Sequence, residues 1–532
     1  MSEMTGAEAL VDSLANENVE VIFGIPGVQT MDILDALYKH DKIWWITVRH
    51  EQSAGYMAFG YARTTGKEGV AAVVPGPGVL NAAAALGTAY AASTSILLLA
   101  GQIESYNIGE NHGSLHEMDD QLEIFGPITK WSHRVSLVED IPQGIHTAFY
   151  EMRSGRPRPV ELEIPLDFLP VSKDFVINKQ ESIEESNIDK EKILNAAALL
   201  SKSEYPLVVA GGGVISSGAS AELTQLAEFL HAPVITSDEG KGSISDEHYL
   251  SLGSANNAAY TAISMADTFL VVGSRVAPRR NQRLVKAGKT IIQIDIDPGE
   301  IGNNQPVDIG IEGDARQTIQ RIMTELPDKS HSKWEKDELI KLKQEAVTTL
   351  RDAAPLQFSI LGTIREQIGG GILVPDVTTL GYWCQMAYPV YEPRTYLSSS
   401  YFSSLGYAFP TALGAKIGNP DKLILALCGD GGFLYTATEL ATAVQESINT
   451  VTLVLNNNSY GTCEKIQRNR FQNRLIGTRL HNPDFARFTE SFGAVGIKLQ
   501  SVEELSDALK SAFSETLPVV IELPVPDMIN PW

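Results

Sequence analysis

The sequence predicts three α/β domains in series, each a doubly wound parallel sheet covered by helices. The first 170 residues alternate helical periods with short apolar runs such as EVIFGIPG, WWITV, VAAVV and SILLLAG. This alternation is typical of a parallel sheet with helices on both faces. It recurs with PLVVAGGG and TFLVVGS, and again with KLILALCGD, TVTLVLNNN and PVVIELPVP. A length of 532 residues fits several domains of roughly 150 residues each.

Two polar segments set the predicted domain boundaries. KDFVINKQESIEESNIDKEK has little apolar periodicity and indicates a linker, whereas DKSHSKWEKDELIKLKQEA is a polar helical stretch. We therefore predict an N-terminal domain over residues 1–170, a central domain over 188–326 and a C-terminal domain over 356–532.

Composition and charge exclude several classes of protein. The formal charge of −23 repels nucleic-acid backbones and anionic lipid, so we expect neither partner. Three cysteines without CxxC spacing argue against a disulfide framework or a zinc site and suit a reducing cytoplasm. The N-terminus does not resemble a signal or transit peptide.

Residues 70–103 carry no charge and are long enough to be considered as a membrane span. The PGPG sequence and the Ala-rich middle of this stretch predict strand, loop, buried helix and strand rather than a membrane helix.

The strongest motif lies in the third domain. One strand runs into GDGG, a crossover helix follows, and the next strand runs into NNN, which places Asp430 and Asn457 27 positions apart. A right-handed crossover makes the two strands parallel, so both residues fall at the same carboxyl edge of the sheet. Their hard oxygens, with a nearby backbone carbonyl, suit Mg²⁺ beside substrate phosphates. Gly431 and Gly432 offer bare N–H groups to a phosphate. The competing interpretation is a glycine-rich turn with an aspartate cap.

This pattern resembles the magnesium–diphosphate motif of the thiamine diphosphate-dependent enzymes, and the resemblance extends over nearly the whole chain. RHEQSAGYMAFGYARTTGKEGV and PGPGVLNAAAALGTAY in the first domain, and IIQIDIDPGEIGNNQPVDIGIEGDA in the central one, are similar to acetolactate synthase and its decarboxylase and carboligase relatives. The resemblance implies a pyrimidine-binding N-terminal domain, a diphosphate-binding C-terminal domain and thiamine diphosphate with Mg²⁺ as cofactors. It also implies an active site shared between subunits, hence a homodimer or homotetramer.

The resemblance further assigns the site residues. Glu51 would hydrogen-bond N1′ of the cofactor's aminopyrimidine and favour the imino tautomer that removes the C2 proton; unaided, it would be an ordinary residue at a helix start. Leu405 would be the apolar wedge that bends the cofactor, a role compatible with a core leucine. Asp430, Asn457 and the Ser459 carbonyl would hold Mg²⁺. The remaining cofactor-binding residues implied are Gly27, Pro75, Asn81, Val377, Thr378, Thr379, Gly429, Gly431, Gly432 and Tyr460.

Two departures from acetolactate synthase bear on specificity. Where a glutamine usually stands near the substrate, GENHGSLHEMDD places His116, with His112 one helical turn earlier. Histidine titrates near neutral pH, so His116 could move protons or hold an acidic substrate group, although a surface or core histidine competes with this interpretation. In addition, GSRVAPRRNQR replaces the paired aspartates of the flavin segment, which leaves FAD binding open.

The leading hypothesis is decarboxylation or carboligation of a small 2-oxo acid or aldehyde. Enzymes of the benzoylformate decarboxylase, benzaldehyde lyase or sulfoacetaldehyde acetyltransferase type are the alternatives. A dinucleotide-binding oxidoreductase is a distant one, since GGGVISSG is not a full GxGxxG fingerprint and explains neither GDG nor NNN. A non-catalytic paralogue would have lost Glu51 or the metal ligands, and all are present.

Overall fold

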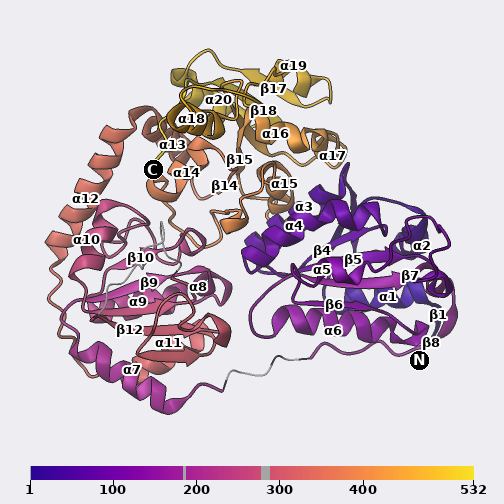
Figure 1. Cartoon of the computed structure of the whole chain (residues 1–532), viewed down its shortest axis with the longest axis horizontal. Helices are drawn as coiled ribbons and strands as arrows, with labels where there is room; N and C mark the ends of the chain where they lie inside the picture. The colour runs from indigo at the N-terminus through magenta and orange to yellow at the C-terminus, as the bar shows by residue number, and fades with distance from the viewer. Residues whose placement is uncertain (1, 182, 184–186, 277–287, 532) are drawn as a thin grey trace. The chain divides into compact units, whose positions relative to one another are not determined.

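The fold is known from a computed structural model that describes residues 2–181, 183, 187–276 and 288–531. It confirms the predicted α/β class: each of three successive parallel sheets is built from strands joined by helices (Figure 1). Contacts divide the chain into two compact units. The first comprises Met1–Ile183, Val374–Thr378 and Ser399–Pro526, and the second comprises Glu184–Leu373, Thr379–Ser398 and Asp527–Trp532.

The N-terminal sheet has the strand order β3-β2-β4-β5-β7-β6, and its pairs are parallel. Its central strands are wholly buried because helices cover both faces. The strands of this domain are β1 (Ser2–Thr5), β2 (Val21–Gly24), β3 (Trp44–Thr47), β4 (Gly69–Val73), β5 (Ile96–Gln102), β6 (Trp131–Arg134), β7 (Val160–Pro165) and β8 (Ser172–Phe175). The helices are α1 (Gly6–Asn16), α2 (Met31–Tyr38), α3 (Glu51–Thr65), α4 (Pro77–Ala91), α5 (Leu122–Phe125) and α6 (Ile141–Arg153).

Residues 70–103 form the predicted strand, loop, buried helix and strand, as β4, α4 and β5. In the part of the chain that the structure describes, no helix has the length and apolar character that a membrane span requires. One element was not predicted: β1 pairs antiparallel with β8, outside the parallel sheet. β8 occupies the beginning of the segment interpreted as a linker.

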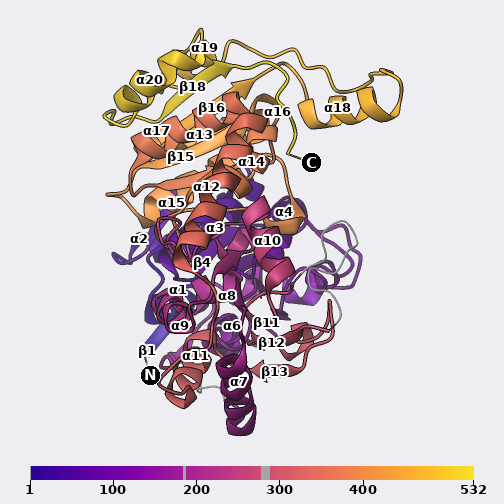
Figure 2. The same ribbon diagram turned by 90° about the vertical axis from the view of Figure 1, so that its left-hand side faces the viewer.

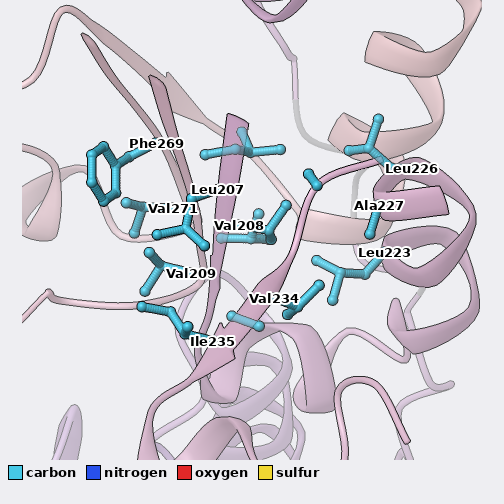
Figure 3. Packing of buried hydrophobic residues seen from close by; sticks show 14 of the residues in the cluster. Leu207, Val208, Val209, Leu223, Leu226, Ala227, Val234, Ile235, Phe269 and Val271 are labelled. Carbon is cyan, nitrogen blue, oxygen red and sulfur yellow. The ribbon is translucent and has the colours of Figure 1, made fainter. Parts of the chain in front are cut away.

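The central sheet has the order β10-β9-β11-β12-β13, again parallel. Its core is mostly aliphatic: side chains of β9, β10 and β11, with Phe269 of β11 among them, pack with Leu223, Leu226 and Ala227 of α9 (Figure 3). The strands are β9 (Pro206–Ala210), β10 (Val234–Thr236), β11 (Thr268–Val272), β12 (Thr290–Asp295) and β13 (Ile309–Glu312). The helices from here to the next sheet are α7 (Lys190–Lys202), α8 (Gly212–Ser216), α9 (Ser220–Leu230), α10 (Asn257–Met265), α11 (Ala315–Glu325), α12 (Lys336–Ala353) and α13 (Pro355–Ile368).

The C-terminal sheet has the order β14-β15-β16-β18-β17. The predicted crossover helix between β15 and β16 is interrupted, because a 3-10 turn over Ala437–Glu439 separates α16 from α17. Figure 2 shows α18 extending away from this sheet. The strands are β14 (Ile372–Pro375), β15 (Ile424–Gly429), β16 (Val451–Asn456), β17 (Val495–Lys498) and β18 (Val519–Pro524). The helices are α14 (Thr379–Ala387), α15 (Ala408–Gly418), α16 (Asp430–Thr436), α17 (Leu440–Gln445), α18 (Gly461–Arg470), α19 (Phe485–Glu490) and α20 (Leu505–Ala512).

Within the first unit, α3 packs closely on α15 because each helix has a glycine at the contact. A Cβ added at Gly60 of α3 would lie 1.9 Å from the carbonyl oxygen of Thr411. A Cβ added at Gly414 of α15 would lie 1.9 Å from the carbonyl oxygen of Met57. Any larger residue would force the helices apart. This contact fixes α3, whose first residue is Glu51.

Candidate functional site

The predicted metal residues meet at the carboxyl edge of the C-terminal sheet. β15 and β16 are parallel neighbours, with Gly429 in register with Leu455. Asp430 follows β15 as the first residue of α16, and Asn457 and Ser459 follow β16. The structure therefore brings together all three residues that the sequence assigned to the metal.

Asp430 is a buried carboxylate held by amides. The residue is only 2% exposed. Oδ1 accepts a hydrogen bond from the Gly431 N–H at 2.9 Å, and Oδ2 accepts one from Asn482 Nδ2 at 2.8 Å. Burial raises the pKa of Asp430, and these neutral donors oppose that rise only in part. A buried acid held by neutral donors is an environment that a cation would stabilise.

The geometry of this edge suits a metal–diphosphate group. The donors are a carboxylate, an amide and a carbonyl, which are hard ligands of the kind Mg²⁺ prefers. The first turn of α16 has no room for side chains at its two glycines: a Cβ at Gly431 would lie 2.4 Å from Tyr460 Cε1, and one at Gly432 would lie 2.7 Å from Asp376 Oδ2. The described residues hold no cluster of three or more His, Cys, Asp or Glu for a metal, so any metal here needs the amide and carbonyl ligands as well.

The residues after β14 lie at the same edge. The Asp376 N–H donates to the Leu427 carbonyl at 2.8 Å, which holds the segment against β15. Val377 donates its N–H to Asp376 Oδ1 at 2.8 Å, and a Cβ at Gly429 would lie 3.6 Å from Thr378 Cβ. Thr379 begins α14, and its Oγ1 lies 3.4 Å from Asn530 Oδ1.

Asp376 is a buried acid at this edge that accepts hydrogen bonds from two loop segments. Its Oδ2 accepts the N–H of Gly406 at 3.2 Å, next to the predicted wedge Leu405. Leu405 is half-buried, and the Gly406 carbonyl accepts from Thr436 Oγ1 at 3.0 Å. Burial raises the pKa of Asp376 to about 7, against the lowering effect of the Val377 and Gly406 N–H groups.

A second cluster lies at the carboxyl edge of the N-terminal sheet. Glu51 begins α3, where the His50 side chain caps the helix by accepting from the Gln52 N–H at 3.1 Å. Glu51 is half-buried, and its Oε2 accepts a hydrogen bond from Asn81 Nδ2 at 2.9 Å. Two residues predicted separately, one for catalysis and one for the cofactor, are therefore in direct contact.

Gly27 and Pro75 flank this cluster after β2 and β4. A Cβ at Gly27 would lie 2.2 Å from Val74 Cγ1, so the loop after β2 lies against the PGPG loop. The Gly76 N–H donates to Gln121 Oε1 at 3.0 Å. Gln121 was missed from the sequence because it precedes a short helix and belongs to no motif.

His116 lies beside the PGPG loop, but the helical spacing predicted for His112 and His116 is wrong. Residues 111–121 form an irregular loop with a turn at Leu115 and His116, and His116 has a left-handed φ of 71°. The cause is the Glu117 carboxylate, which accepts the backbone N–H groups of Gly113 and Ser114 at 2.6 and 2.8 Å. His116 Nδ1 is buried, with no hydrogen-bond partner among the described residues. His112 is exposed, and its Nδ1 lies 3.5 Å from Asn107 Oδ1.

The central domain gives the dinucleotide alternative no support. In GGGVISSG, a Cβ at Gly213 would lie 2.5 Å from the Cα of Gly273. The glycine thus allows α8 to approach the end of β11, which is a packing role. The altered flavin segment, residues 273–283, falls largely outside the described residues.

Three family models match the chain in order. They are those of the thiamine pyrophosphate enzyme N-terminal TPP binding domain (residues 4–124), central domain (193–322) and C-terminal TPP binding domain (376–523). The two clusters described above occur within the two TPP-binding matches or directly adjoin them.

Whole-length relatives agree with these matches. The chain is 34% identical to the acetolactate synthase large subunit of Haemophilus influenzae, covering 97% of this chain and 93% of that protein. It is 33% identical to the "Probable acetolactate synthase large subunit" of Methanocaldococcus jannaschii, covering 98% and 92%. It is 35% identical to the "Probable 2-ketoarginine decarboxylase" of Pseudomonas aeruginosa, covering 98% and 94%.

Proposed function

Because the chain belongs to the thiamine pyrophosphate enzyme family, we propose that it uses thiamine diphosphate and Mg²⁺ to decarboxylate a small 2-oxo acid and to join the remaining acyl unit to a second 2-oxo acid or aldehyde. The observation that carries the proposal is the pair of acids at the two sheet edges. Asp430 is buried among neutral donors, and Glu51 is half-buried and accepts a hydrogen bond from the Asn81 amide. The first suits a metal and the second suits proton transfer.

The C-terminal edge is proposed to hold the diphosphate. Asp430, Asn457 and the Ser459 carbonyl would bind Mg²⁺. The phosphate oxygens would lie against the first turn of α16 at Gly431 and Gly432, where the Gly431 N–H already donates to Asp430 Oδ1. Val377, Thr378, Thr379, Gly429 and Tyr460 would complete this end of the cofactor site. At the other end, Gly27, Pro75, Asn81 and Leu405 would enclose its rings.

Glu51 is proposed to exchange a proton with a ring nitrogen of the cofactor. The Asn81 amide donates to Oε2, which leaves Oε1 as the carboxyl atom that would meet a ring nitrogen of the bound cofactor. A carboxyl group placed in this way can hold or release a proton at Oε1 without moving. When bound, thiamine diphosphate supplies a nucleophilic carbon and takes up the electrons that decarboxylation releases.

His116 is proposed to face the substrate. Its backbone lies against the PGPG loop, where its carbonyl oxygen would be 2.7 Å from a Cβ at Gly76. Nδ1 is buried without a partner among the described residues, a situation that costs free energy unless a ligand supplies one. The imidazole could thus donate a proton to a product alkoxide or hold an anionic substrate group.

The active form is proposed to be a homodimer or homotetramer. Glu51 and Asp430 lie at the edges of two different sheets, and exposed apolar side chains occur near both edges, including Leu80 at 49% and Tyr435 at 56%. A second copy could cover such side chains. Light scattering together with activity at nanomolar concentration tests this, because a fully active monomer would contradict it.

Proton NMR of the purified chain with thiamine diphosphate, Mg²⁺ and a panel of 2-oxo acids and aldehydes tests the reaction itself. We expect consumption of a 2-oxo acid and a new carbon–carbon bond in the product, both dependent on the cofactor and the metal. If no 2-oxo acid or aldehyde of the panel changes while the cofactor is shown to be bound, the proposed reaction is wrong.

A further inference from the structure

A chain of hydrogen bonds crosses the C-terminal sheet and ends on Asp430. Asn482 Nδ2 donates to Asp430 Oδ2 at 2.8 Å and to Asn456 Oδ1 at 3.0 Å. Asn456 Nδ2 in turn donates to Glu522 Oε1 at 2.8 Å. Glu522 is 3% exposed and lies on β18, Asn456 ends β16, and Asp430 follows β15. These hydrogen bonds thus link three neighbouring strands through two asparagines.

We propose that Asn482 is a positioning residue for the metal ligand Asp430, and that Glu522 and Asn456 fix its orientation. This inference rests on the proposed function, in which Asp430 binds Mg²⁺, and extends it to residues that do not touch the metal. The network sets the affinity of the site for Mg²⁺ by holding the carboxylate in one orientation. Partners that orient metal ligands contribute strongly to metal affinity in this way.

The direction of these hydrogen bonds follows from the contacts of Asn456. Its Oδ1 accepts the Asn458 N–H at 3.1 Å, so this amide turns its NH₂ group toward Glu522 Oε1 and its oxygen toward Asn482. That oxygen and the Asp430 carboxylate are both acceptors, so Asn482 must direct its own NH₂ group at both of them. Flipping either amide would set acceptor against acceptor. The orientation of Asn482 is therefore determined by the network.

Asp430 is held at both oxygens as a result. Oδ1 accepts from the Gly431 N–H at 2.9 Å while Oδ2 accepts from Asn482, so the carboxylate cannot rotate without breaking one of these bonds. Each carboxylate oxygen has further acceptor capacity, so Asp430 can still bind a cation. Pre-orientation of this kind lowers the cost of binding because less freedom is lost when the metal arrives.

The remaining atom of Asn482 also indicates a ligand. Its Oδ1 is buried and has no hydrogen-bond partner in the part of the chain that the structure describes. An unpaired buried acceptor costs about 1–3 kcal/mol. Mg²⁺ usually retains water molecules, and a metal-bound water is a donor that this acceptor would suit.

Glu522 has a second set of contacts that a purely structural role would explain. Its Oε2 accepts the Phe485 N–H at 3.2 Å and lies 3.7 Å from Lys498 Nζ. These contacts tie the start of α19 to β18 and link β18 to its neighbour β17, so changing Glu522 alters packing as well as the network. Among the described residues, Asn482 contacts neither the Phe485 N–H nor Lys498, so it is the better residue to substitute.

The test compares Asn482→Ala with Asn449→Ala in the full chain. Asn449 precedes the opposite, amino end of β16 and donates to the Glu515 carbonyl at 3.3 Å, so it is a matched asparagine away from the metal. Thiamine diphosphate is titrated into each protein by calorimetry over a series of Mg²⁺ concentrations. We expect Asn482→Ala to raise the Mg²⁺ concentration for half-saturation about 10- to 100-fold, with binding restored in excess Mg²⁺, and Asn449→Ala to match the wild type.

The outcomes separate this inference from the proposed function. If the wild type binds thiamine diphosphate without Mg²⁺, or not at all, the metal assignment fails. If the wild type shows Mg²⁺-dependent binding and Asn482→Ala keeps the same half-saturation, the positioning role is wrong. A loss that excess Mg²⁺ cannot restore, together with a lower urea midpoint of the metal-free protein, also refutes it. Should Asn482→Ala not fold, Asn482→Ser retains one donor, and we expect a smaller shift in the same direction.

Discussion

The two acids of the proposed site, Glu51 and Asp430, stand at equivalent places in two similar sheets but in opposite surroundings. Both directly follow the carboxyl end of a parallel strand or its loop and begin a helix. Asp430 is 2% exposed and accepts hydrogen bonds at both oxygens. Glu51 is half-buried and bonded by Asn81 at one oxygen. The same position in the fold therefore serves either to fix a charge or to leave a proton exchangeable.

Burial and hydrogen bonding decide between these two roles. A metal ligand must be ionised and immobile, so surrounding amide donors are useful and proton exchange is not. A group that moves protons must reach its partner and change charge at low cost, which favours partial exposure and few fixed donors. The comparison predicts that substituting Asp430 affects cofactor binding, whereas substituting Glu51 affects its activation.

Asp430→Ala should have the largest effect. Removing the carboxylate takes away the only charged group among the proposed metal ligands, so thiamine diphosphate uptake should fall below what calorimetry detects at concentrations that saturate the wild type. Addition of a chelator to the wild type should have the same consequence. Unchanged affinity in the variant would show that Asp430 does not hold the metal.

Glu51→Gln should leave binding intact and slow activation. Glutamine keeps the size of the side chain, and its oxygen can still accept from Asn81, but it cannot exchange a proton with the cofactor. We expect hydrogen–deuterium exchange at the cofactor C2, followed by NMR, to slow by roughly a thousandfold, which corresponds to about 4 kcal/mol. Exchange at the wild-type rate would remove the distinction between the two acids.

The metal edge could be predicted from the sequence because parallel topology is a local rule. A strand, a crossover and a second strand suffice to place Asp430 beside Asn457, and the structure has both residues at that edge. Asn482 could not be predicted, since it lies in a loop 52 positions from Asp430 and contacts it only through the tertiary fold. The role of Glu522 could not be predicted either, because an acidic residue within an apolar strand does not indicate which residue it will contact.

The helical spacing predicted for His112 and His116 is wrong for a different reason. A four-residue spacing indicates a helical turn only where the backbone is helical, and here Gly109 and Gly113 adopt φ values of 80° and 77°. The Glu117 carboxylate then takes backbone N–H groups that a helix would have used. The β1–β8 pair was missed because its strands are far apart in the chain.

Asp376→Asn tests a third acid, buried at the same edge as Asp430 but outside the proposed metal ligands. Because burial raises the pKa of Asp376 to about 7, the folded protein keeps a proton that the unfolded chain releases near pH 4. The free energy of unfolding therefore decreases as pH rises from 4 to 7. The asparagine variant lacks this proton, so between pH 5 and 7 its free energy of unfolding should fall by about 2–3 kcal/mol less than that of the wild type.

Urea unfolding of the metal-free proteins at several pH values measures this difference. If the two proteins lose stability in parallel over that range, Asp376 is ionised throughout, and the contrast between a protonated acid and a metal-binding acid at one sheet edge does not hold.

His116→Gln should have the smallest effect, confined to the product. His116 belongs to neither acid cluster, and its backbone lies against the PGPG loop, so thiamine diphosphate affinity should not change. An imidazole can be neutral or cationic near pH 7, whereas a glutamine amide offers only fixed dipoles. We therefore expect a change of a few-fold in the ratio of decarboxylation to carboligation products and a flatter pH profile near neutrality, measured by NMR.

His112→Gln, at an exposed histidine of the same loop, is the control and should match the wild type. If His116→Gln keeps the wild-type product ratio and pH profile, His116 does not face the substrate, and other residues of the site determine which product forms.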